Sequence, residues 1–281
     1  MIDFIKLSIP REIGEKIKLP LSQLVNTSTG EVISKTTTNQ REQYVNTSTY
    51  ETHTYKNLTF KKTNGHKEFF NGTRSKDVYY TLFGSVHIFK NNGRHNYDTF
   101  SLNQLKSTID DLCLYFGIDP DSAQIKNLEF GVNVLLPKSA NYFIDLVKCY
   151  KGKPFNQNYY KENGGKMIEF HMGIYSGLKI YNKGKQYFEK FGTSDNLLRL
   201  EIKTQSAQFC NERGIYTLSD LLERKNALKL AQTIVNYYDG LDIFRSYQSP
   251  KKIKPKQREI IANLNNRDHW QNINSDQRKQ A

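Results

Sequence analysis

The sequence predicts an α+β fold with a mainly antiparallel central sheet and helices covering one face of that sheet. Two kinds of periodicity support this fold class. Several segments alternate apolar and polar residues with the period of two that places successive side chains on opposite faces of a strand. Other segments, such as residues 101–117 and 139–150, repeat apolar residues at the spacing of one helix face.

The first part of the chain is expected to contain mainly strands. Residues 2–9 form a strand that ends at Pro10, and residues 58–62 and 78–90 form two more. In the last of these segments, His87 lies on the face that also carries polar residues.

Residues 22–56 are rich in Ser, Thr and Asn, and they contain the phrase VNTST twice, at 25–29 and 45–49. This segment is either a duplicated hairpin arm or a threonine-rich loop. We expect short strands with mobile connections.

The second part of the chain alternates helices with strands. A glycine ends the first helix and a serine caps the second, in agreement with helix-end preferences. The expected helices are 101–117, 139–150, 217–223 and 227–241, and the expected strands are 127–137, a hairpin within 167–183, and 197–203.

The charge of the chain favours a polyanionic partner. Its 281 residues include 41 Lys and Arg against 28 Asp and Glu, for a net charge of +13. Such an excess favours nucleic acid, because phosphate neutralisation releases condensed counterions. The 18 Tyr and 16 Phe suit stacking on unpaired bases, and they equally suit a β-rich core.

The cysteines and the apolar runs indicate a cytoplasmic protein without a membrane partner. Cys113, Cys149 and Cys210 are scattered and form no CxxC pair, which is typical of small buried residues in a reducing compartment. No apolar run reaches the roughly 18 residues that a membrane span requires. The N-terminus lacks the apolar core of a secretory signal.

Beyond Tyr247 the composition changes, with many lysines around two prolines. We therefore expect one main domain over residues 1–245, in which 22–56 is the arm or loop, and a basic extension over 246–281.

Three of the expected strands share an unusual property. Each has a clean apolar face, and each carries ionisable side chains on the other face. These side chains are Glu129 in the first strand, Lys179, Tyr181 and Lys183 in the second, and Arg199, Glu201 and Lys203 in the third.

If the three strands share a sheet, their polar faces combine into a site with definite chemistry. Two carboxylates and an imidazole can hold a hard divalent cation such as Mg²⁺ or Mn²⁺. A tyrosine can attack a phosphodiester, although its ordinary pKa of about 10 leaves it neutral at pH 7. The flanking Lys179 and Lys183 favour the phenolate of Tyr181. The alternative is a half-exposed sheet whose outer face is simply polar.

The same residues carry a resemblance to a known family. KIYNKGKQY (179–187), followed by LLRLEIK (197–203), resembles the paired motifs of rolling-circle replication initiators of the Rep-trans plasmid and filamentous-phage gene II types. NLEFGVNVLLPKSANYF (127–143) and GRHNYDTF (93–100) resemble two preceding blocks of the phage type. The four blocks occur in the family's order, over roughly residues 78–223.

This resemblance implies a metal-dependent nicking endonuclease of the HUH-related class, encoded by a plasmid, a phage or a similar mobile element. In that class the tyrosine bonds to the 5′ phosphate of the nick and leaves a 3′ hydroxyl that primes DNA synthesis. The substrate would be single-stranded or supercoiled origin DNA, with host helicase and polymerase as further candidate partners. The sequence departs from the ordinary HUH plan, because it has no His-hydrophobic-His pair.

On this hypothesis the active site lies on the uncovered face of the sheet, and each residue has an expected role. Tyr181 is the nucleophile, assisted by Lys183 and Arg199. Glu129, Glu201 and His87 are the ligands of Mg²⁺ or Mn²⁺, and His171 is an alternative to His87. The expected DNA contacts are Lys179, His95, Asn96, Lys203, Lys251, Lys252 and Lys254.

Three other functions remain open from the sequence. A conjugative relaxase would use the same chemistry for DNA transfer. A DNA- or RNA-binding protein without chemistry would explain the charge and the aromatic residues. A structural or regulatory protein would use the sheet for protein contacts. Tyr175, Tyr187 and Tyr216 are available as a second nucleophile.

Overall fold

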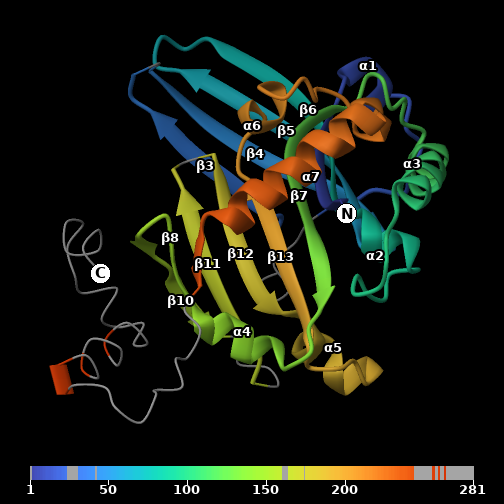
Figure 1. Cartoon of the computed structure of the whole chain (residues 1–281). Helices are drawn as coiled ribbons and strands as arrows, with labels where there is room; N and C mark the ends of the chain where they lie inside the picture. Colours follow the sequence, from blue (N-terminus) through green and yellow to red (C-terminus); the bar gives the residue numbers. More distant parts are fainter. Residues whose placement is uncertain are drawn as a thin grey trace. The chain divides into compact units, whose positions relative to one another are not determined.

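A computed structural model describes residues 2–23, 31–41, 43–159, 164–173 and 175–243, together with positions 255, 256, 259 and 263. The chain has the expected α+β fold, built on antiparallel sheet and helices (Figure 1). It divides into two compact units. Unit 1 comprises residues 1–96, 100–129 and 204–227, and unit 2 comprises residues 97–99, 130–203 and 228–281.

The sheet of unit 1 has the strand order β7-β1-β6-β5-β4-β2, and β3 also pairs with β4. Its strands are β1 (Ile2–Ile9), β2 (Ser22–Gln23), β3 (Ser34–Asn39), β4 (Tyr44–Tyr55), β5 (Leu58–Phe69), β6 (Arg74–Ser85) and the first half of β7 (Gln124–Leu135). The long antiparallel strands β4, β5 and β6 form an arm.

The helical segments of unit 1 are α1 (Arg11–Gly14), α2 (Val86–Lys90), α3 (Leu102–Phe116), α6 (Gln208–Asn211) and the 3₁₀ turn η1 (Ser219–Leu222). Helix α3 begins with a complete capping box between Ser101 and Gln104 and ends at Gly117, whose φ of 67° suits a glycine. The buried face of α3 includes Leu105, Ile109 and Leu112.

The sheet of unit 2 has the strand order β10-β11-β12-β13-β7. It contains β10 (Asn156–Tyr159), β11 (Lys166–Met172), β12 (Ser176–Asn182), β13 (Leu197–Thr204, of which Thr204 belongs to unit 1) and the second half of β7. A small second sheet joins β14 (Leu241–Ile243), β8 (Val147–Tyr150) and β9 (Lys153–Pro154).

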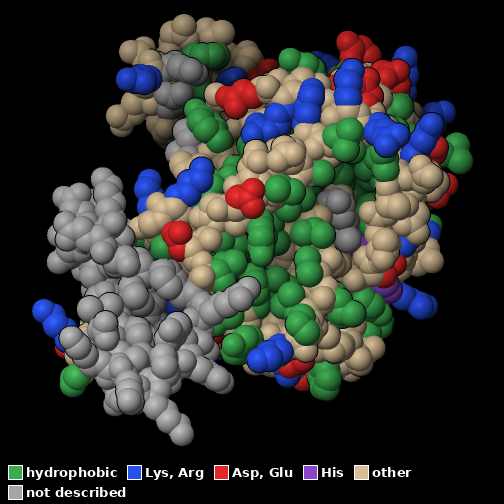
Figure 2. Space-filling view, in the orientation of Figure 1, with side chains coloured by type: hydrophobic (Ala, Val, Ile, Leu, Met, Phe, Trp, Pro, Cys, Tyr) green, Lys and Arg blue, Asp and Glu red, His purple; other side chains and the backbone are tan. Residues whose placement is uncertain are grey.

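Helices α4 (Ala140–Leu146) and α7 (Arg224–Asp239) pack on the apolar face of the unit 2 sheet. Between them and the strands lies an apolar groove of about 320 Å³. Its walls include Val132, Leu198, Leu200 and Ile234. Figure 2 shows hydrophobic side chains gathered on the surface of this part of the molecule. The expectation of helices on one face of the sheet is therefore confirmed in unit 2.

Most predicted elements are confirmed, but several were wrong in part. The helix predicted over 217–223 is the 3₁₀ turn η1, and the short strands expected within 22–56 include the 12-residue β4. The strand predicted over 78–90 starts earlier and ends at Ser85, whose hydroxyl accepts from the backbone of Ile88 and starts α2. The helix predicted over 139–150 ends at Leu146, where β8 begins. No element was predicted over residues 184–191; together with Lys183, which had been placed in a strand, they form α5 (Lys183–Phe191).

None of the helices within the described residues is both long enough and apolar enough to cross a membrane. The first VNTST phrase lies outside the described residues, as does residue 246 at the predicted domain boundary, whereas the second phrase lies within β4.

Candidate active site

Unit 2 brings five of the predicted site residues into one cluster. Lys179 and Tyr181 come from β12, Arg199 and Glu201 from β13, and Lys183 from the start of α5. The period-two argument correctly placed the strand members on one face. Lys183 joins them from the first turn of the helix, which the sequence analysis had treated as strand.

Glu201 lies at the centre of this cluster. Its Oε2 accepts a hydrogen bond from the Tyr181 hydroxyl at 3.2 Å and another from Arg199 Nε at 2.8 Å. Its Oε1 lies 3.9 Å from Lys179 Nζ. The carboxylate is therefore compensated by two cations while it orients the phenol.

The ammonium group of Lys183 lies between two aromatic rings. Its Nζ is 5.4 Å from the ring centroid of Tyr181 and 5.0 Å from that of Tyr187. The Lys183 side chain is only 1% exposed. A buried positive charge near a phenol favours the phenolate over the neutral form.

Asn182 explains how Lys183 reaches this position. Its Oδ1 accepts from Lys185 N at 2.9 Å and so caps α5, while its Nδ2 donates to Asn141 Oδ1 and to the Asp195 carbonyl. A glycine is also required at position 184 for this turn from strand to helix, because a Cβ there would clash with the Ser194 carbonyl. The Tyr-Asn-Lys-Gly sequence therefore turns the chain from strand to helix directly beside the phenol.

Two residues of β7 that the sequence analysis had not assigned also support the cluster. Asn133 Oδ1 accepts from Arg199 Nη1 at 3.2 Å, and Asn133 Nδ2 donates to the Tyr97 carbonyl at 2.9 Å. Gly131 allows β7 to approach β13, since a Cβ there would clash with the Leu200 carbonyl. An asparagine within a strand is the signal that could have identified Asn133.

The side chains of this cluster are buried, whereas they were expected on an uncovered face of the sheet. Tyr181 is 5% exposed, Glu201 3% and Arg199 0%. On this side the rings of Tyr97, Tyr187 and Phe191 pack together, with centroids 5.3 to 5.7 Å apart. Sequence could not predict this burial, because burial depends on packing between segments that are distant along the chain.

The remaining ligand and loop candidates belong to unit 1. His87 is fully buried in α2 and stacks on Phe100, with centroids 4.7 Å apart. Asn96 is buried and donates to Asp3 Oδ2 at 2.6 Å, which gives it a structural contact. His95 accepts at its carbonyl from Asn91 Nδ2. Glu129 is half-buried on β7.

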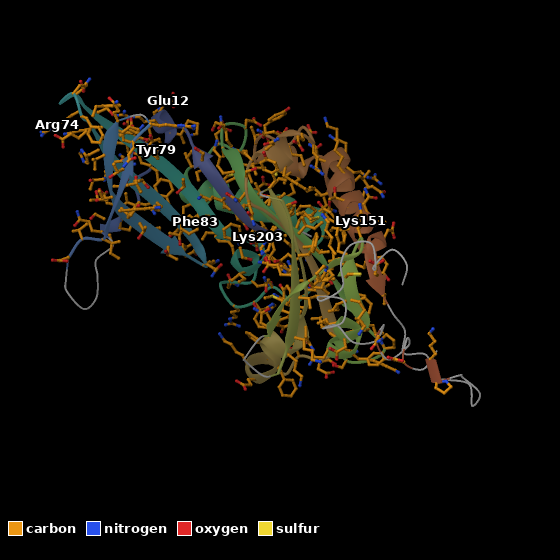
Figure 3. All side chains as sticks on the ribbon, turned by 90° about the vertical axis from the view of Figure 1, so that its left-hand side faces the viewer. Glu12, Arg74, Tyr79, Phe83, Lys151 and Lys203 are labelled. Carbon is orange, nitrogen blue, oxygen red and sulfur yellow. The ribbon has the colours of Figure 1, made fainter. Side chains whose placement is uncertain are left out.

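His171, the alternative to His87, is exposed and pairs with Gly177 across β11 and β12. Tyr181 is four residues further along β12, which corresponds to about 13 Å in a strand. This register separates the His171 imidazole from the phenol. Lys203 is the last residue of unit 2 on β13, and Figure 3 labels it. Lys251, Lys252 and Lys254 lie outside the described residues.

The described side chains do not form an obvious metal site. No group of three or more His, Cys, Asp or Glu side chains within the described ranges could hold a metal ion. Both oxygens of Glu201 already face donors or cations. The arrangement therefore does not fit Mg²⁺ or Mn²⁺ as it stands, and ligation by Glu129, Glu201 and His87 stays a prediction.

Cys113 and Cys210 are poor nucleophiles. Burial raises the pKa of Cys113 to about 12 and that of Cys210 to about 11. Both thiols are therefore protonated near neutral pH, and the thiolate is the reactive form. Tyrosine remains the better nucleophile candidate on this chain.

No protein-family model and no curated protein matches the chain. Its fold is similar to a solved structure described as a rolling circle replication initiator protein from Geobacillus stearothermophilus, at 12% sequence identity and a TM-score of 0.36. That alignment covers 94% of this chain and 96% of the other. At this TM-score the similarity carries no argument, so the function has to be argued from the site.

Proposed function

We propose that the chain is a replication initiator that nicks DNA at an origin, with Tyr181 as the nucleophile. The observation that carries this proposal is the hydrogen bond from the Tyr181 hydroxyl to Glu201, whose carboxylate Arg199 also binds. A phenol held by a carboxylate and surrounded by three cations suits attack on a phosphodiester.

The reaction is a transesterification in which the number of bonds is conserved. The phenolic oxygen of Tyr181 attacks the phosphorus, an O–P bond forms, and the bond from phosphorus to the 3′ oxygen breaks. Glu201 receives the phenolic proton, and the departing 3′ oxygen takes a proton from solvent. The products are a 5′-phosphotyrosine and a free 3′ hydroxyl. The reverse reaction closes the nick.

The cations have separate roles in this scheme. Lys183 stabilises the phenolate through its position over the ring. Arg199 keeps the Glu201 carboxylate oriented toward the phenol. Lys179, whose side chain is 19% exposed, is positioned to neutralise the incoming phosphate.

A divalent metal would neutralise charge on the phosphate when bound. Because the described side chains do not form a metal site, no step of this scheme depends on one. The metal requirement is tested directly by comparing cleavage in Mn²⁺ with cleavage in EDTA.

The burial of Tyr181 favours a second candidate function, a DNA-binding protein without chemistry. At 5% exposure the phenol is not accessible to a phosphodiester unless neighbouring side chains move. A conjugative relaxase uses the same chemistry as the first candidate, and only the origin that is cleaved separates the two.

The deciding experiment is a search for the covalent intermediate. The protein is incubated with supercoiled DNA carrying the origin of its own element, and products are resolved in denaturing gels. We expect the wild type to nick and to stay attached to one 5′ end, and Tyr181→Phe to bind without nicking. Tyr175→Phe and Tyr216→Phe are matched controls, because these side chains are exposed and outside the cluster. Covalent attachment by Tyr181→Phe would remove Tyr181 from the mechanism.

A further inference from the structure

One face of the unit 1 sheet carries lysines and aromatic rings instead of an apolar core. The strand register places Tyr50 beside Thr63 and Thr63 beside Tyr79, in one row across β4, β5 and β6. Lys61 and Phe83 lie on the same side, and Lys6 of β1 pairs with Phe83. We call this side, defined by Lys6, Tyr50, Lys61, Tyr79 and Phe83, the lysine–tyrosine face.

The core of unit 1 lies on the opposite side of these strands. Phe60 and Leu82 are buried there, and the Tyr80 ring packs against Gly14 of α1. On the lysine–tyrosine face, by contrast, Tyr79 is 52% exposed and Lys6 is exposed. Figure 3 shows Tyr79 and Phe83 along β6. Alternation along one strand therefore separates a core face from an accessible face that carries large rings.

The lysines of this face repel one another. Lys61 Nζ lies 3.5 Å from the ring centroid of Tyr50. The pKa of Lys61 is lowered, first by desolvation and then by the positive charges of Lys6 and Lys35. Clustered positive charge does not stabilise the fold, whereas a polyanion lying across the face would relieve the repulsion.

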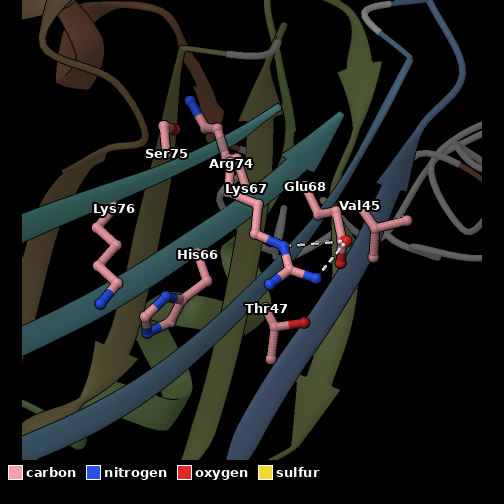
Figure 4. A pocket seen from close by; sticks show the side chains of 8 residues that line it. All are labelled: Val45, Thr47, His66, Lys67, Glu68, Arg74, Ser75 and Lys76. Atoms are coloured by element: carbon pink, nitrogen blue, oxygen red, sulfur yellow. Dashed lines mark hydrogen bonds and ion pairs between the residues drawn. The ribbon is translucent and has the colours of Figure 1, made fainter. Parts of the chain in front are cut away.

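A pocket on the opposite side of strands β4, β5 and β6 also carries basic side chains and can be compared with the lysine–tyrosine face as a place for an anion. It has a volume of about 270 Å³, and its lining includes His66, Glu68, Arg74 and Lys76 (Figure 4). There the Arg74 guanidinium is bound by Glu68, at 3.2 and 3.0 Å. The Arg74 charge is therefore already compensated, which makes Arg74 less available to an anion.

We propose that the lysine–tyrosine face binds single-stranded DNA, with bases stacked on Tyr79 and Phe83 and phosphates held by Lys6 and Lys61. The inference rests on the proposed function in taking DNA as the polymer, but it requires no cleavage. It assigns strand binding to residues of unit 1 that take no part in the Tyr181 cluster.

The rings distinguish a single strand from a duplex. Aromatic side chains interleaved with cations are stacking platforms for unpaired bases, and every base has a face that can stack. A duplex already stacks its bases internally and would use only the lysines. A single strand uses both features of the face.

The test measures binding of a fluorescent oligo-dT of about 15 nucleotides by anisotropy. All variants are made in the Tyr181→Phe background, so that binding is measured without nicking and a failure of the nicking mechanism cannot affect the result. We expect Tyr79→Ala to weaken binding about tenfold and Tyr79→Phe to bind like its parent, since stacking needs the ring and not the hydroxyl. Lys61→Gln is expected to lower the slope of log affinity against log salt by about 0.7.

Lys76→Gln is the matched control, because Lys76 is on β6 but on the opposite side. Thermal unfolding of each variant confirms that it is folded. The proposal is overturned if Tyr79→Ala binds within twofold of its parent, or if Lys76→Gln weakens binding as much as Lys61→Gln. It is also overturned if an unlabelled duplex competes as well as the single strand. If the wild type also fails to nick while these binding differences persist, the result supports this face and contradicts only the Tyr181 mechanism.

Discussion

The Tyr181 hydroxyl donates to Oε2 of Glu201 at 3.2 Å, and Arg199 Nε donates to the same oxygen at 2.8 Å. The proposed nucleophile and its proposed proton acceptor are thus joined directly, and the acceptor's charge is balanced by a fully buried guanidinium. The chemistry and the stability of this part of unit 2 therefore depend on the same carboxylate.

Glu201→Gln should change both the rate of nicking and the stability of the fold, and the two changes can be measured separately. The variant keeps the shape of the side chain but cannot take the phenolic proton, so we expect nicking to slow by roughly 10² to 10⁴. It also leaves Arg199 without its carboxylate partner, which should cost about 3–5 kcal/mol in the free energy of unfolding. Nicking assays and urea denaturation measure the two quantities.

The control for this variant is Glu68→Gln. Glu68 and Arg74 form an ion pair whose side chains are 58% and 77% exposed, so its loss should change stability by about 1 kcal/mol or less. Nicking by Glu201→Gln at the wild-type rate, in a sample that is folded by circular dichroism, would contradict the role of Glu201.

Lys183→Met tests the buried ammonium over the phenol. Methionine has similar length and no charge, so the phenolate loses the buried cation over its ring and we expect nicking to slow about tenfold at pH 7. Raising the pH should restore part of the rate, because hydroxide then generates the phenolate that Lys183 had stabilised.

Lys185→Met is the appropriate comparison, because Lys185 also lies in α5 but contacts Phe188, at 5.4 Å from the ring centroid. It should nick at close to the wild-type rate at every pH. If the two variants behave alike, the position of Lys183 over Tyr181 has no catalytic meaning.

Gly184→Ala should damage the site through the backbone. A Cβ at this position clashes with the Ser194 carbonyl, so α5 must move and carry Lys183 away from the phenol. Overpacking of this kind costs about 1–3 kcal/mol, and we expect nicking to fall with it. Gly177→Ala in β12 is the matched control, because its Cβ would meet its nearest atom, the Phe170 carbonyl oxygen, at 3.4 Å. Equal stability of the two variants would show that α5 tolerates the shift.

Periodicity predicted the parts of the site that lie on regular strands. Alternation alone placed Arg199 and Glu201 on the opposite face of β13 from Leu198 and Leu200, as observed. It could not show that this face is buried, because burial there depends on packing against residues distant in the sequence.

Other features of the fold left no periodic pattern of apolar residues in the sequence. Residues 63–68 of β5 and 74–77 of β6 are polar on both faces, so an apolar alternation could not reveal the length of the arm. Helix α5 was missed because it opens with Lys-Gly, a poor helix start. The Asn182 cap and the contact with Ser194 outweigh that propensity.

Removing one of the repelling lysines on the lysine–tyrosine face should make the fold more stable. Because the pKa of Lys61 is lowered in the folded chain, its charge destabilises the fold at pH values below the folded pKa. This cost disappears as the pH rises through the ordinary value of 10.5. Lys6→Gln removes one of the repelling charges, so we expect Tm to rise by about 1 °C at pH 7. The gain should shrink near pH 10.5, where lysines lose their charge.

Differential scanning fluorimetry at the two pH values, alongside Lys76→Gln, checks this prediction. Lys76 lies on the other side of β6, and its removal should not produce the same pH-dependent gain. The Lys6 variant should at the same time bind oligo-dT more weakly, because it has lost a phosphate contact. A variant that is more stable but binds less well would show that these lysines are kept for the ligand. A fall in Tm at pH 7, with unchanged binding, would instead make Lys6 an ordinary structural residue.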